Sequence, residues 1–166
     1  MTQKKAFRFL VLIFVFCILP YVVIAQPVTR VKLSRVKNTF NLGTWLIGNV
    51  DDNDPACAYR DDGIDSYFIT ATDDSTITPG GFYLQNAAAT AEIPYSLLWS
   101  NTPAPGTIVL SDGVASAASG ANTTDRRCRD QPDPNTANIR VQISSSALAA
   151  APSGTYTATV TLVMQP

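Results

Sequence analysis

Apolar and polar residues alternate along much of the chain beyond residue 39, with the period of two that is typical of β-strands. The clearest example is the C-terminal segment, residues 154–164. Its apolar positions share one phase: Tyr156, Ala158, Val160, Leu162 and Met164. Threonine fills the opposite phase at positions 155, 157, 159 and 161. This pattern predicts a strand with one face in a core and the other in water.

Seven further segments have shorter runs of the same kind and are predicted strands: residues 40–46, 56–60, 66–72, 82–85, 93–100, 107–110 and 137–144. Two of them place large apolar side chains on one face: Ile93, Tyr95, Leu97 and Trp99, and likewise Ala137, Ile139, Val141 and Ile143. Residues rich in Gly, Pro, Asp and Asn predict turns between strands, for example at 49–55 and 61–63. We expect residues 115–122 to form a loop and residues 145–150 a single helical turn. Short strands separated by such turns predict an all-β sandwich or barrel, and we favour two sheets bridged by a disulfide.

The N-terminus has the pattern of a secretory signal. Lys4, Lys5 and Arg8 precede an apolar run at 9–19. Small residues then occupy the −3 and −1 positions of a cleavage site, the last of them at Ala25. The run is shorter than the ~20 residues of a membrane-spanning helix, which favours cleavage after Ala25 over an anchor. The predicted organisation is a signal peptide at 1–25, an N-terminal extension at 26–38 and one β-sandwich domain at 39–166. No membrane span is expected after cleavage.

Three cysteines are present, and Cys17 would leave with the signal. Cys57 and Cys128 remain, and a pair of cysteines in an exported chain most simply forms one disulfide. Two free thiols or a metal-binding pair are the alternative.

Charge and composition argue against several functions. The chain has 12 Lys and Arg, three of them in the predicted signal, against 13 Asp and Glu, so nucleic acid is not an expected partner. It has no histidine, which removes the commonest general base and zinc ligand. We therefore expect a protein that is not an enzyme and needs no cofactor or metal. The acidic stretches at 51–54 and 61–65 are ordinary turn composition or, alternatively, calcium ligands.

Several motifs carry a family resemblance. They are the segment ALAAAPSGTYT at 147–157 before an alternating final strand, FNLGTW at 40–45, Cys57 on the next strand, and IPYSL at 93–97. With these motifs the chain resembles pilus subunits of the chaperone–usher pathway, and it looks most like the spore coat protein U-like group of archaic pilins.

This resemblance implies an immunoglobulin-like β-sandwich that lacks its last strand and functions as a structural subunit of a bacterial pilus. A periplasmic chaperone would fill the resulting groove first, and the N-terminal extension of a neighbouring subunit would replace it at the outer-membrane usher. The acceptor edge would be the terminal strand carrying residues 156–164, and Val31 and Leu33 are the candidate donor residues. The extension could instead be the domain's own first strand. The expected location is the periplasm in transit and then the cell surface. The alternative function is a monomeric secreted β-sandwich that binds a glycan or a protein.

Overall fold

The computed structural model describes residues 29–130 and 133–166. The predicted signal sequence, its cleavage site and residues 26–28 lie outside the described residues. In the part of the chain that is described, no helix has the length and apolar character to cross a membrane.

The larger of the sheets has five strands in the order β1-β2-β9-β6-β7, and the neighbours pair antiparallel. The strands are β1 (Val31–Ser34), β2 (Val50–Arg60), β9 (Ala137–Ile143), β6 (Ser96–Ser100) and β7 (Ile108–Val109). The predicted strand at 137–144 is confirmed almost residue for residue.

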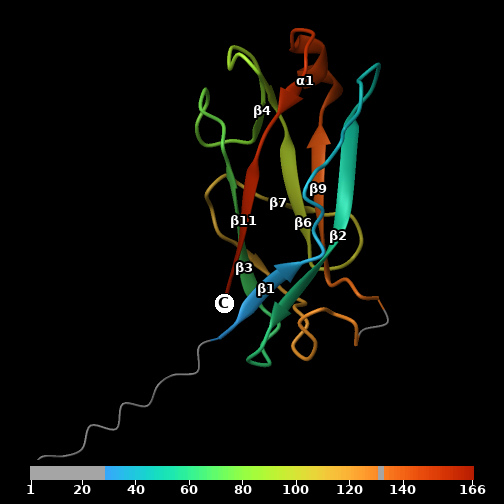
Figure 1. Cartoon of the computed structure of the whole chain (residues 1–166), viewed down its shortest axis with the longest axis vertical. Coiled ribbons are helices and arrows are strands. Elements are labelled where there is room, and N and C mark those ends of the chain that lie inside the picture. The colour runs from blue at the N-terminus through green and yellow to red at the C-terminus, as the bar shows by residue number, and fades with distance from the viewer. Residues whose placement is uncertain (1–28, 131–132) are drawn as a thin grey trace, which may run out of the picture.

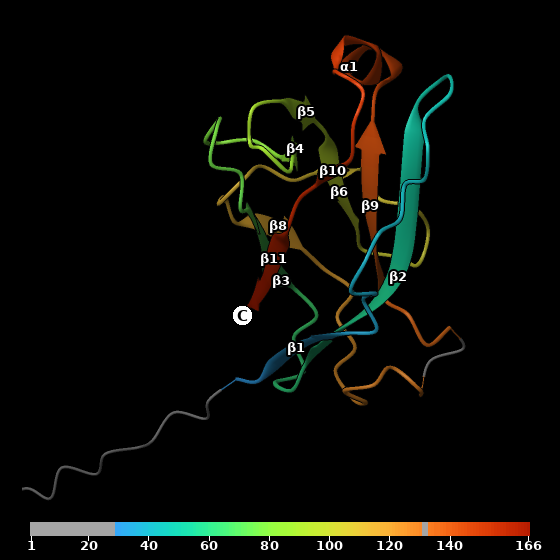
Figure 2. The ribbon, with the colours of Figure 1, turned by 45° about the horizontal axis from the view of Figure 1, so that its top comes forward.

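Two three-stranded antiparallel sheets complete the sandwich on the other side of the molecule, as Figures 1 and 2 show. One contains β11 (Val160–Gln165), β3 (Tyr67–Asp73) and β8 (Ser116–Ala118), and the other β10 (Tyr156–Thr157), β4 (Tyr83–Asn86) and β5 (Glu92–Pro94). The short helix α1 (Ser145–Ala150) connects β9 to β10, and its N-cap Ser144 accepts a hydrogen bond from Ala147 N–H at 3.2 Å. The fold is an immunoglobulin-like β-sandwich, as predicted.

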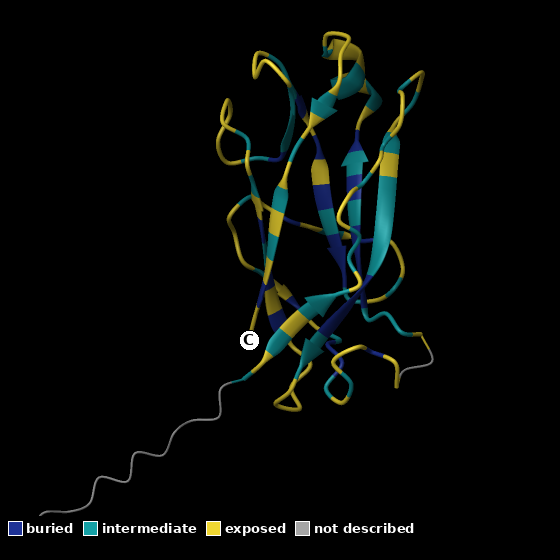
Figure 3. Ribbon diagram, viewed as in Figure 1, coloured by how far each residue is buried: buried dark blue, intermediate teal, exposed yellow. Residues whose placement is uncertain are grey.

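The core lies between the layers and is built from the predicted apolar phases. Leu97 and Trp99 of β6 are almost completely buried, as are Ile139 and Ile143 of β9. Figure 3 shows buried and more accessible positions along these strands, and they alternate from Ser96 to Trp99 of β6 and from Ile139 to Ile143 of β9. A strand period of two places these side chains on one face, which explains why the sequence pattern predicts the core correctly.

Several predicted elements are corrected by the structure. Residues 40–46 form no strand, and the predicted turn at 49–55 is the first half of β2. That half pairs with β9 over seven residue pairs, although it contains Pro55. Proline is tolerated there because residues 50–56 have a strand partner on one side only within the described chain.

The remaining differences concern interruptions and one missed strand. The predicted segment at 93–100 is divided at Tyr95 into β5 and β6, and the predicted C-terminal strand is divided at residues 158–159 into β10 and β11. Strand β8 lies within the predicted loop at 115–122.

The predicted disulfide between Cys57 and Cys128 is present, with a Cα–Cα distance of 6.0 Å. It joins β2 to the loop that follows β8. The same loop is hydrogen-bonded to β2 at Asn122, whose N–H donates to the Ala58 carbonyl at 2.8 Å and whose carbonyl accepts from Arg60 N–H at 2.9 Å. The cross-link therefore reinforces a contact that the backbone also makes.

Candidate functional site

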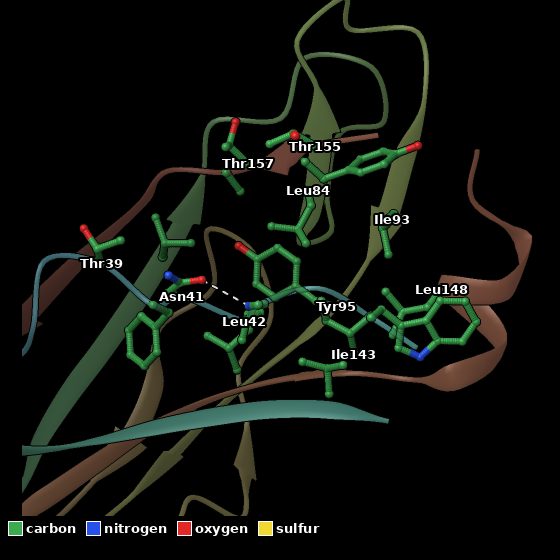
Figure 4. A pocket seen from close by; sticks show the side chains of 18 of the residues that line it. Thr39, Asn41, Leu42, Leu84, Ile93, Tyr95, Ile143, Leu148, Thr155 and Thr157 are labelled. Atoms are coloured by element: carbon green, nitrogen blue, oxygen red, sulfur yellow. Dashed lines mark hydrogen bonds between the residues drawn. The ribbon is translucent and has the colours of Figure 1, made fainter. Parts of the chain in front are cut away.

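The described part of the chain contains a groove of about 990 Å³ at the seam between the two layers of the sandwich. Its floor comes from both layers and is almost entirely apolar. The floor residues are Leu84, Ile93, Tyr95, Leu97, Ile139, Val141 and Ile143, and Leu148 of α1 closes one end. Figure 4 shows Leu84, Ile93, Tyr95 and Ile143 gathered around this space. The sequence pattern identified most of these residues as core, but it did not indicate that a groove lies above them.

One wall of the groove is the C-terminal segment. Tyr156, Ala158, Val160 and Leu162 line it and are partly buried, while the threonines between them are exposed. The predicted two-residue phase of this segment is therefore confirmed. Met164 shares the phase but lies in the core beyond the groove, with 8 % of its surface exposed.

The backbone of this wall has one free side. Strand β11 pairs with β3 over six residue pairs, from Val160 opposite Asp73 to Gln165 opposite Phe68. Within the described residues no strand pairs with the other edge of β11. That edge therefore presents backbone donors and acceptors that another strand could use.

The opposite wall is a segment without regular secondary structure, residues 36–45, which we call the strap. All ten of its residues line the groove, and it leads from β1 toward the start of β2. In Figures 1 and 2 it lies alongside β2. Val36, Phe40 and Leu42 are partly buried against the hydrophobic core. The strap contains most of the segment at 40–46 that was predicted as a strand.

Polar contacts of one residue hold the strap to β2. The backbone N–H of Lys37 donates to the Asp54 carboxylate at 2.6 Å, and its ammonium group donates to the Asp52 carboxylate, also at 2.6 Å. The same ammonium lies 4.4 Å from the centroid of the Phe40 ring. The acidic residues at 51–54, predicted as a turn, thus lie on a strand, and two of them bind the strap.

The ionisable side chains that line the groove are few: Lys37, Tyr95 and Tyr156. Burial raises the pKa of Tyr95, and the carboxylates of Asp73, Asp74 and Asp112 raise it further, so this hydroxyl stays neutral. In residues 29–130 and 133–166 no three Cys, Asp or Glu side chains are placed to hold a metal ion together. The groove is therefore lined mainly by apolar and uncharged polar side chains.

The candidate donor residues lie on β1, which pairs antiparallel with β2 in the same chain. Val31 is opposite Arg60, Leu33 is opposite Ala58, and both are partly buried. The segment thus occupies the position of the domain's own first strand, which was the alternative considered from the sequence.

Comparison with known proteins gives a structural likeness only. No family model and no curated protein matches the sequence. A chain in a solved structure described as "Chaperone-tip adhesin complex is vital for synergistic activation of CFA/I fimbriae biogenesis" matches with a TM-score of 0.57 and 14 % identity. The match covers 82 % of this chain and 42 % of that chain, so the present chain corresponds to less than half of its neighbour. At this identity the likeness shows a shared fold.

Proposed function

We propose that this protein is a non-enzymatic structural subunit of a bacterial surface pilus, assembled when an extended segment of another chain fills the groove beside β11. The observation that carries the proposal is that residues 156–160 and Leu162 line an apolar groove, and that β10 and β11 of this segment have outer edges without a strand partner within the described residues.

Strand addition explains both features at once. An added strand would satisfy the free backbone groups of β11, and its alternate side chains would cover the floor. Seven residues of extended chain span about 23 Å, so a donor of roughly that length would follow the wall from residue 156 to residue 162. Left uncovered, an edge beside apolar side chains is a site of aggregation.

The partners follow from the same proposal. They are a periplasmic chaperone, an outer-membrane usher and neighbouring pilus subunits, and the protein would pass through the periplasm to the cell surface. The fimbrial complex found as a structural neighbour supports this assignment. Membership of the spore coat protein U-like group is a finer prediction that rests on the sequence motifs.

The alternative function, a monomeric secreted β-sandwich that binds a glycan or a protein, has one observation in its favour. Strand β1 is part of the chain's own sheet, so the described chain has no free donor arm. Under this alternative the chain neither donates a strand to a neighbour nor receives one in its groove.

Peptide capture by the exported full chain tests the proposal. Two 12-residue peptides serve as donors: a copy of residues 26–37 and a neutral peptide of alternating Val and Thr. We expect at least one of them to bind and to raise the free energy of unfolding by about 3 kcal/mol at a hundredfold excess over its Kd.

Matched variants test whether the peptide binds in the groove. Leu162→Asp puts a charge into the groove and should weaken capture at least tenfold, whereas Thr161→Asp puts the same charge on the exposed face and should leave it unchanged. Leu162→Thr serves as a milder groove variant. A chain that unfolds reversibly and gains no stability from either peptide would contradict the proposal.

A further inference from the structure

The strap has the sequence of a strand but not the hydrogen bonds of one. Val36, Phe40 and Leu42 share one phase and are partly buried, while Thr39 and Asn41 are exposed. Within the described residues, no backbone-to-backbone hydrogen bond involves residues 36–45. The strap is therefore held by its side chains and by one backbone group, the Lys37 N–H that donates to the Asp54 carboxylate.

The strap and an incoming strand would use the same floor. Val36, Phe40 and Leu42 pack against the hydrophobic cluster that Val160 and Leu162 also contact from the other wall. Figure 4 shows Leu42 beside Tyr95 and near Ile143, where the inward side chains of an added strand would have to lie.

The polar anchor of the strap is concentrated on Lys37, which contacts Asp54, Asp52 and Phe40. The side chains of Lys37 and Asp52 are 33 % and 31 % exposed, so dissolved salt can screen their attraction. An ion pair of this exposure is weak enough to open repeatedly.

We infer that the strap, which forms one wall of the groove and packs Val36, Phe40 and Leu42 against its floor, must move outward before a strand can enter, and that the Lys37 anchor limits the rate of this movement. The inference rests on the proposed function, because it concerns how the same groove is filled. The strap would reduce exposure of the apolar floor until a donor strand binds, and opening of the anchor would set the rate of donor capture.

The test compares two methionine substitutions in the exported full chain. Lys37→Met removes the charge that binds β2 but keeps an apolar stem, and Lys32→Met makes the same change on an exposed position of β1. Stopped-flow fluorescence with a labelled copy of residues 26–37 and with the neutral Val/Thr peptide gives the rate of capture. We expect Lys37→Met to capture peptide roughly two to five times faster than Lys32→Met, a range that matches the strength of a part-exposed ion pair. Raising the salt concentration should narrow this ratio toward one.

Hydrogen exchange gives a second readout. The amide of residue 37, which is bonded to Asp54 of β2, should exchange faster in Lys37→Met than in Lys32→Met without peptide, and faster in both once peptide is bound. If both variants capture peptide at the same rate, or if bound peptide protects this amide, the strap is a fixed wall and the inference is overturned while the proposed function stands. If neither peptide binds any variant, the proposed function fails and the inference fails with it.

Discussion

At the scale of single residues, the buried pair of Tyr67 and Trp99 combines ring packing with a hydrogen bond in the core. Their rings meet edge to face at 6.4 Å between centroids, and the Trp99 indole N–H donates to the Tyr67 hydroxyl at 3.0 Å. Burial raises the pKa of Tyr67 to about 12, although the indole hydrogen bond lowers it slightly. The pair joins β3 to β6 and so links the two layers of the sandwich.

Tyr67→Phe should destabilise the protein by about 1–3 kcal/mol, because it leaves the buried indole N–H without its acceptor. Urea denaturation followed by tryptophan fluorescence measures the loss. Tyr95→Phe is the matched control, since no described residue forms a hydrogen bond with the Tyr95 hydroxyl, and it should cost clearly less. Equal losses in the two variants would show that the hydrogen bond contributes nothing specific.

At the scale of elements, the sequence pattern predicts a strand correctly where one face of the strand is buried. It is misleading where pairing with a neighbouring strand determines whether a segment becomes a strand. The phases of β6, β9 and the C-terminal segment are visible as alternating side chains. The first half of β2 is not, because its acidic residues favour turns and only pairing with β9 makes it a strand. An ion pair between Asp51 and Arg140, with atoms 3.1 Å apart, supports that pairing.

The predictions for the strap and for β8 failed in opposite directions for the same reason. Residues 40–46 alternate like a strand but form no ladder with any strand of the described chain, so they remain irregular. Residues 116–118 are small and show no pattern, yet they pair with β3. In both cases the available ladder partner, rather than local preference, determines the outcome.

Glu92 connects three segments around the β4–β5 hairpin. Its carboxylate accepts hydrogen bonds from Ser75 Oγ at 2.7 Å, Gln85 Nε2 at 3.1 Å and Thr78 N–H at 3.2 Å. Desolvation raises the pKa of Glu92, but these hydrogen bonds outweigh it and lower the pKa from 4.5 to about 2. Because the folded-state pKa is the lower one, the stabilisation is complete above about pH 4.5 and is lost as the pH falls toward 2.

Glu92→Gln should therefore reduce the acid sensitivity of the fold. We expect its Tm to fall less between pH 5 and pH 2.5 than that of the unmodified protein, by a scan of circular dichroism against temperature at each pH. Asp65→Asn is the control, because Asp65 is an exposed carboxylate whose side chain forms no hydrogen bond within the described residues. If both variants follow the unmodified protein, the Glu92 contacts do not contribute to acid stability.

At the scale of the whole molecule, the groove is the feature that sequence patterns left out. Residues of its floor were predicted as core, and its β10–β11 wall was predicted as a terminal strand. The space between the walls depends on how far apart two layers and a strap come to lie, and no local pattern encodes that distance. The resemblance to pilus subunits, rather than periodicity, led to the expectation of a groove.

The disulfide constrains the molecule on the same scale, since it links residues that are 71 positions apart. Replacing both Cys57 and Cys128 by Ala should lower the free energy of unfolding by roughly 4 kcal/mol, mainly by enlarging the unfolded ensemble. Urea unfolding of the double variant measures the loss, and the unmodified protein with its disulfide reduced should show a similar loss. A loss below about 1 kcal/mol in both would mean that the loop contacts at Asn122 hold the region without the cross-link.

The pairing of β11 with β3 also limits how fast the chain can finish folding. Val160 meets Asp73 and Gln165 meets Phe68, so the ladder forms between residues from opposite halves of the chain. The pairing of β2 with β9 is similarly long-range. Such contacts require large loops to close before any hydrogen bond forms, which makes folding slow. Throughout that interval the apolar faces of the unpaired strands are open to other molecules. Aggregation or partner binding during folding therefore competes with completion of the native sheets.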